Sequence, residues 1–136
     1  MVASRFHEAL TRRLVEGAVE TCARRGIARG AIRTVWVPGA FELPVAAAKA
    51  AERLRPQAIV AVGCLIKGQT PQYAAIGHAV AQGLTDVSVR TKIPVGFGVI
   101  IADSVAQAKA RAGGHWGNRG EEAAEAALDM THVLAR

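Results

Sequence analysis

The segment that decides the fold runs from Ala58 to Tyr73 and reads AIVAVGCLIKGQTPQY. Its first half, up to Leu65, is almost wholly apolar, which is typical of a strand that is buried on both faces of a sheet. Its second half contains a lysine, a glycine and the pair Thr70-Pro71, which indicate a turn leading into a helix that Thr70 caps. The segment therefore predicts a buried strand followed directly by a helix.

The same strand, turn and helix pattern recurs along the chain. A second turn of this kind, VPGAFELP, spans residues 37–44. We expect strands at 1–4, 32–37, 58–65 and 95–101. We expect a first helix that stops at Arg24-Arg25-Gly26, and further helices at 42–54, at 70–89, at 103–112 (capped by Asp103 and ended by Gly113-Gly114) and beyond the cap Asn118. Such alternation gives a parallel sheet with helices on both faces. The predicted fold class is α/β: a three-layer sandwich with a four-stranded parallel sheet, in a single domain over residues 1–136.

The composition limits the classes of protein to which this chain can belong. The 136 residues, 51% of them hydrophobic, are enough for one core, and the two cysteines fall on buried positions, as reduced thiols do. The net charge of +6 would attract nucleic acid or an anionic metabolite. Scattered arginines without a nucleic-acid-binding motif favour the metabolite. Because no signal peptide or bilayer-spanning segment is recognisable, we expect a soluble, cytoplasmic protein with no nucleic-acid or membrane partner.

The strand-to-helix turns predict a ligand site. In a parallel sheet these turns converge at the carboxyl ends of the strands, where small ligands bind. The small residue Ala40 lets a ligand approach the backbone, and the turn Lys67–Thr70 joins a cation to a helix start, which suits phosphate. Plainer roles stay open: Glu42 fits the helix dipole, Thr70 a simple N-cap, and Phe6 a contact onto the first helix.

Six blocks of sequence resemble the lumazine synthases, enzymes of the penultimate step of riboflavin synthesis. They occur in the order of that family and cover nearly the whole chain: Ser4-Arg5-Phe6, PGAFELP at 38–44, IKGQTP at 66–71, PVGFGV at 94–99, Ala110-Arg111-Ala112-Gly113 and GNRGEEAA at 117–124. The resemblance implies a flavodoxin-like, lumazine synthase-like fold. It also implies condensation of 5-amino-6-ribitylaminouracil with 3,4-dihydroxy-2-butanone 4-phosphate, giving 6,7-dimethyl-8-ribityllumazine, without a metal or organic cofactor.

The resemblance also assigns roles to residues. Those expected to hold the pyrimidine ring and ribityl chain are Phe6, Ala40, Phe41, Glu42, Leu65, Ile66 and Phe97. Those expected to hold phosphate are Gly68, Gln69, Thr70 and Arg111, with Lys67, Arg119 and His7 as further candidates. Family sites lie between subunits of a pentamer, so Phe97 and either Arg111 or Arg119 would reach a neighbouring chain. Such pentamers often assemble into icosahedral shells.

One expected residue is absent. The family places a proton-transferring histidine two residues after the threonine, and here that position holds Gln72. Glutamine does not titrate near neutral pH, and the loss of a positioned base lowers rates by roughly 10²–10⁴-fold. His7, next to Phe6, and His115, near Arg111, are candidate substitutes, and plain surface histidines otherwise.

The sequence leaves three functions open. The first is a working lumazine synthase, of normal or reduced rate, supported by the set Phe6, Glu42, Thr70 and Arg111. The second is an assembly scaffold of the same fold, forming pentamers or a protein cage with impaired catalysis, which Gln72 favours. The third is a flavin- or nucleotide-binding relative without turnover.

Overall fold

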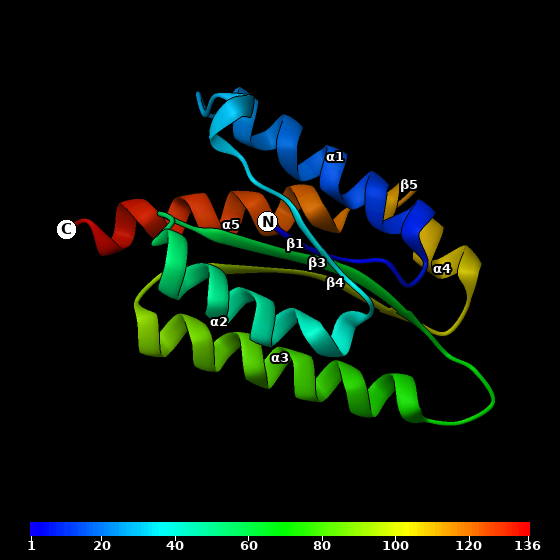
Figure 1. Ribbon diagram of the computed structural model, residues 1–136. Helices are drawn as coiled ribbons and strands as arrows, with labels where there is room; N and C mark the ends of the chain where they lie inside the picture. Colours follow the sequence, from blue (N-terminus) through cyan, green and yellow to red (C-terminus); the bar gives the residue numbers. More distant parts are fainter.

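A parallel sheet forms the middle layer of the molecule (Figure 1), in a computed structural model that describes residues 1–136. Its strands, in the spatial order β2-β1-β3-β4, are β1 (Val2–Ser4), β2 (Val35–Val37), β3 (Ile59–Ile66) and β4 (Val95–Ala102). β3 and β4 pair along their whole length, from Ile59 beside Val95 to Ile66 beside Ala102. Because every pair is parallel, all strands end at one edge of the sheet, the carboxyl edge, and begin at the opposite amino edge.

Two pairs of helices cover the faces of the sheet. α1 (Glu8–Arg24) and α5 (Arg119–Leu134) pack on one face, and α2 (Leu43–Leu54) and α3 (Gln72–Thr91) pack on the other (Figure 1). The short helix α4 (Val105–Ala110) and a small hairpin of β5 (Ala112–Gly114) and β6 (Gly117–Asn118) follow β4 at the carboxyl edge. Two 3₁₀ turns, Arg29–Ala31 and Ala40–Glu42, complete the chain. The three-layer sandwich with four parallel strands is confirmed.

The core divides along β3, whose residues alternate between two apolar clusters. Val60, Val62 and Cys64 face the α1 and α5 side, whereas Ile59, Ala61 and Leu65 face the α2 and α3 side. All residues from Ile59 to Leu65 are buried, as the apolar run predicted. No helix has the combination of length and hydropathy that crossing a bilayer requires.

Close backbone packing holds α5 against its neighbours. A Cβ atom on Gly120 would lie 2.0 Å from the carbonyl oxygen of Leu14 in α1, and one on Gly96 of β4 would lie 2.1 Å from that of Ala123 in α5. Any side chain at these two positions would therefore force the elements apart. The cap of α5 is confirmed: the side chain of Asn118 accepts hydrogen bonds from the backbone of Gly120 (2.8 Å) and Glu121 (3.2 Å).

Several predicted boundaries were wrong for local reasons. The strand expected at 32–37 begins only at Val35, because residues 29–31 form a 3₁₀ turn that takes the chain across the amino edge. The helix expected from Glu42 begins at Leu43, since Glu42 still belongs to the preceding 3₁₀ turn. The glycines 113 and 114 do not merely end a helix; they form β5, and Gly113 has a φ of +87°, which favours glycine.

Two predicted helix caps were also wrong. Thr70 does not cap α3, which begins at Gln72 with Pro71 at the cap position and no side-chain hydrogen bond there. Asp103 does not cap α4; Ser104 does, accepting a hydrogen bond from the backbone of Gln107 at 3.1 Å. That helix ends at Ala110 rather than Ala112. Asp103 instead accepts a hydrogen bond from a tyrosine, described below.

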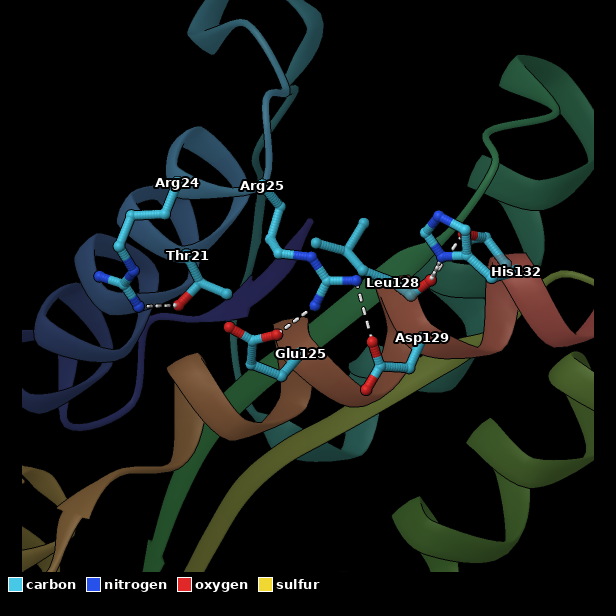
Figure 2. A network of polar contacts seen from close by, with 8 residues as sticks. Thr21, Arg24, Arg25, Glu125, Leu128, Asp129 and His132 are labelled. Atoms are coloured by element: carbon cyan, nitrogen blue, oxygen red, sulfur yellow. Dashed lines mark hydrogen bonds and ion pairs between the residues drawn. The ribbon is translucent and has the colours of Figure 1, made fainter.

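A polar network ties the end of α1 to α5 near the amino edge (Figure 2). The guanidinium of Arg25 donates to Asp129 at 2.9 Å and to Glu125, and these hydrogen bonds, with Asp129 the stronger influence, raise the pKa of Arg25. On the flanking turns, Arg24 donates to the hydroxyl of Thr21 at 3.0 Å. These contacts fix where the chain leaves the first helix before it crosses the amino edge.

Candidate functional site

The predicted site residues after β1 and β2 lie on the carboxyl edge. Phe6 follows β1 and is 63% exposed, with its ring edge-on to His7 at 4.8 Å between centroids, so it does not pack onto α1 as a buried contact. Phe41 is 62% exposed in the 3₁₀ turn after β2, where Ala40 is buried. Two aromatic rings at neighbouring strand ends are thus open to a ligand.

Glu42 folds back toward the start of its own turn. A Cβ atom on Gly39 would lie 3.1 Å from the Oε2 atom of Glu42. The carboxylate therefore lies close over the backbone of Gly39, and a side chain there would require it to move by a few tenths of an ångström. At this place a carboxylate can accept hydrogen bonds from donors of a bound molecule, and the glycine brings such a molecule close to the backbone.

The turn after β3 is exposed but is anchored at both ends. Lys67 donates its backbone N–H to the carbonyl of Ala102 at 2.9 Å, which continues the β3–β4 ladder beyond the strands. At the other end, the hydroxyl of Tyr73 donates to Asp103 Oδ1 at 3.1 Å, and this hydrogen bond raises the pKa of Tyr73. The residues between, Gly68, Gln69 and Thr70, are all exposed. The predicted phosphate turn is therefore held against the end of β4 with its backbone open to solvent.

The first turn of α3 presents Gln72 at this same edge. Gln72 is exposed and directly follows the predicted phosphate turn. Leu65 and Ile66, at the end of β3, lie beneath this region, with Leu65 buried and Ile66 half-buried. His115 lies in the β5–β6 hairpin, edge-on to the exposed Trp116.

The predicted arginines lie beyond β4, near the small hairpin. Arg111 is half-buried directly after α4, and its Nη1 atom lies 3.5 Å from the carbonyl oxygen of Gln107, at the limit of a hydrogen bond. It forms no ion pair, so its charge is free for an anion. The backbone N–H of Arg119 bonds to the carbonyl of Arg111 at 2.9 Å, while its guanidinium pairs with Glu122. Of the two, Arg111 is the better prepared to hold phosphate.

Phe97 does not join the other predicted residues within one chain. It is the third residue of β4, beside Ala61, and is 41% exposed on an edge strand. It lies five positions before Ala102 at the strand end, a distance of about 16 Å at 3.3 Å per residue. Phe97 therefore stands apart from the carboxyl-edge residues of its own chain.

Two features of this edge were not predicted. The hydrogen bond between Tyr73 and Asp103 was missed because it joins residues thirty positions apart. The hydroxyl of Ser4, at the end of β1, is fully buried and has no hydrogen-bond partner. A Cβ atom on Gly63 of β3 would lie only 3.1 Å from the Cβ atom of Ser4. The lack of a side chain on Gly63 therefore leaves space for Ser4. The signal that could have indicated Ser4 is its place in the block Ser4-Arg5-Phe6.

Two clefts of the single chain lie elsewhere. One of about 710 Å³, which we call the amino-edge cleft, is lined by residues at the starts of β1, β2 and β3 and at the ends of α1 and α2. A second, of about 540 Å³, lies beside it near the end of α5. None of the predicted site residues lines either cleft. No three His, Cys, Asp or Glu side chains lie together as they would to hold a metal ion.

Comparison with known families gives one finding. Residues 1–135 match the family model described as 6,7-dimethyl-8-ribityllumazine synthase, which covers all but the last residue of the chain.

Proposed function

Because the chain belongs to the 6,7-dimethyl-8-ribityllumazine synthase family, we propose that it condenses 5-amino-6-ribitylaminouracil with 3,4-dihydroxy-2-butanone 4-phosphate. The observation that carries the proposal is the carboxyl edge, where Phe6, Glu42 and the turn Lys67–Thr70 follow three neighbouring strands. These groups supply a stacking surface, a hydrogen-bond acceptor and an anion-binding turn for the two substrates. The products are the lumazine, phosphate and water.

The aromatic substrate lies on the open rings of this edge. Phe6 stacks on the pyrimidine, and Ala40, Phe41, Leu65 and Ile66 border the ring and the ribityl chain. Glu42 accepts hydrogen bonds from hydroxyl or N–H donors of this substrate. Holding the amine at a fixed place beside the ketone converts a bimolecular condensation into a nearly unimolecular one, which is where most of the rate enhancement arises.

The phosphate lies over the turn after β3. The exposed backbone of Gly68, Gln69 and Thr70 donates hydrogen bonds to its oxygens, and Arg111 adds a guanidinium. A charged donor beside an anion forms a stronger hydrogen bond than a neutral one, so Arg111 stabilises the phosphate as it leaves. Lys67 and Arg119 are further candidate cations, and Arg119 is already paired with Glu122.

The complete site forms between chains. Phe6 and Phe41 are more than half exposed, and Phe97 lies about 16 Å along β4 from the strand end. A neighbouring copy that places its Phe97 over the edge would cover these rings and exclude water. We propose a cyclic pentamer as the functional unit, with an icosahedral shell as its further assembly.

Proton transfer is the step for which this chain is least equipped. Gln72 orients a water or a substrate group by hydrogen bonding but cannot exchange a proton near pH 7. His7, beside Phe6, is the histidine closest to the stacking surface in sequence. The reaction therefore proceeds slowly, driven by positioning and phosphate binding.

The test is direct. Both substrates are mixed with the protein, and the fluorescence of the lumazine product is followed against the same mixture without protein. A rate above that background, saturable in both substrates, supports the proposal. A rate equal to the background contradicts it and leaves the second candidate, an assembly scaffold, which Gln72 favours. Light scattering after size exclusion measures the assembly in either case.

A further inference from the structure

We propose that the amino-edge cleft binds an anionic amphiphile, a molecule with an unbranched apolar chain and one terminal carboxylate. The cleft has a volume of about 710 Å³, within the range of small-molecule sites. It opens at the edge of the sheet opposite to the predicted lumazine site. The proposed function uses none of the residues that line it, so the two assignments are independent.

The walls of the cleft are mostly apolar and come from the ends of α1 and α2, from the chain between α1 and β2, and from the start of β3. Fourteen of the twenty lining residues are hydrophobic, and the larger of them are Ile27, Ile32, Val35, Leu54, Ile59 and Leu128. An apolar chain seated here removes this surface from water, at about 25 cal/mol for each Å² buried.

The charges of the cleft have one sign. Arg33, Arg53 and Arg55 line it, and none of the lining residues is acidic. None of the three guanidiniums forms an ion pair, and the neighbouring carboxylate of Glu52 is paired with Lys49. Three unpaired guanidiniums around an apolar wall are complementary to a carboxylate, which they can bind through two parallel hydrogen bonds.

The apolar walls and the unpaired arginines together indicate which class of ligand fits the cleft. A small, fully polar anion would leave the apolar walls in contact with water, and an uncharged hydrocarbon would leave the arginines without a partner. A long-chain carboxylate satisfies both.

Calorimetry with the assembled protein tests the charge requirement. Dodecanoate, kept below its micelle-forming concentration, is titrated into the wild type, the triple variant Arg33→Gln/Arg53→Gln/Arg55→Gln and the control Arg29→Gln. Arg29 is exposed, unpaired and four residues from Arg33, but it does not line the cleft. We expect the triple variant to bind dodecanoate at least about tenfold more weakly than the wild type does, which corresponds to a loss of about 1.4 kcal/mol in binding free energy. The control should bind as the wild type does, and dodecanol should bind both equally.

Alkylation of Cys22 locates the ligand. Cys22 lines the cleft and is 6% exposed, whereas Cys64 is fully buried, so mass spectrometry can follow one thiol with the other as an internal reference. Bound dodecanoate should slow the alkylation of Cys22 several-fold. The proposal fails if dodecanoate gives no binding heat, if the triple variant binds it as the wild type does, or if Cys22 reacts at an unchanged rate. If the triple variant unfolds, Arg53→Gln alone, on the exposed side of α2, serves in its place.

Discussion

The two edges of the sheet are built in opposite ways. The carboxyl edge gathers side chains that can do chemistry, but they stand on exposed turns, and neither cleft lies among them. The amino edge contains the two clefts, yet its lining holds few groups that could take part in a reaction. The difference teaches that the clefts of one chain and its proposed reaction site need not coincide. The proposed reaction takes place where the strands end, and a second chain is proposed to enclose it.

Helix polarity explains the contrast. In parallel α/β units the helices begin at the carboxyl edge, where their free N–H groups attract anions, and end at the amino edge, where cations are favoured. α1 and α2 accordingly end in Arg24 and Arg25, and in Arg53 and Arg55. Two of the three arginines of the amino-edge cleft, Arg53 and Arg55, are thus first of all helix-end residues. Their lack of partners is what leaves them free for an anion.

The largest expected effect tests how tightly the two edges are packed. Gly120→Ala, at the carboxyl edge, should destabilise the fold by at least about 3 kcal/mol, because its Cβ would meet the backbone of Leu14 at 2.0 Å. Gly30→Ala, at the amino edge, is the matched control, since nothing lies within 4 Å of its Cβ. Its free energy of unfolding should stay within about 1 kcal/mol of the wild type. Denaturant unfolding measures both, and equal values would show that the edges do not differ in packing.

The second effect assigns chemistry to one edge. Arg111→Ala should lower kcat/KM by about 10²–10³-fold, as the loss of a charged donor to a departing phosphate does. Lys109→Ala, two residues away and exposed in α4, should leave kcat/KM within about twofold. Steady-state rates of lumazine formation measure both variants. Equal losses in the two variants would mean that general positive charge, rather than a placed guanidinium, serves the reaction.

The third effect concerns the missing base. Gln72→His should raise kcat by about 10²-fold and add a dependence on pH near 6.5, because a histidine at this position can exchange protons. Gln82→His, on an exposed position of the same helix, is the control and should change neither. The pH profile of kcat separates the two variants. An unchanged rate in Gln72→His would indicate that the geometry of the site, and not only the base, has been lost.

The smallest effect compares the two thiols. Burial raises the pKa of Cys64 to about 11 and raises that of Cys22, so both stay protonated in the folded chain at a pH where the unfolded chain ionises them. The contribution of the buried thiols to the free energy of unfolding is fully present below pH 9 and is lost as the pH rises from about 9 to 11. We expect a loss of up to about 2 kcal/mol from Cys64. Unfolding measured across this range should show a shallower decline for Cys64→Ala, and an identical decline would exclude Cys64 as its source.

The places of many candidate site residues in the fold were predictable because these residues lie on turns next to strands that the sequence marks clearly. The apolar run at Ile59–Leu65 placed β3, and with it the turn that follows. The errors fell where local signals compete. Thr70 and Asp103 are both good capping residues, yet α3 begins two residues after Thr70, and Asp103 accepts a hydrogen bond from Tyr73 while Ser104 caps α4. Capping propensity alone therefore did not decide where these two helices begin.

The sequence by itself determined the alternation of strands and helices, the buried central strand and the family, because apolar periodicity and ordered motifs are local properties of the chain. Only the tertiary structure decided that Tyr73 meets Asp103, that Gly120 lies against Leu14, and that three unpaired arginines surround an apolar cleft. These arrangements join residues far apart in sequence. They depend on how closely the layers pack, and no pattern within a single segment contains that information.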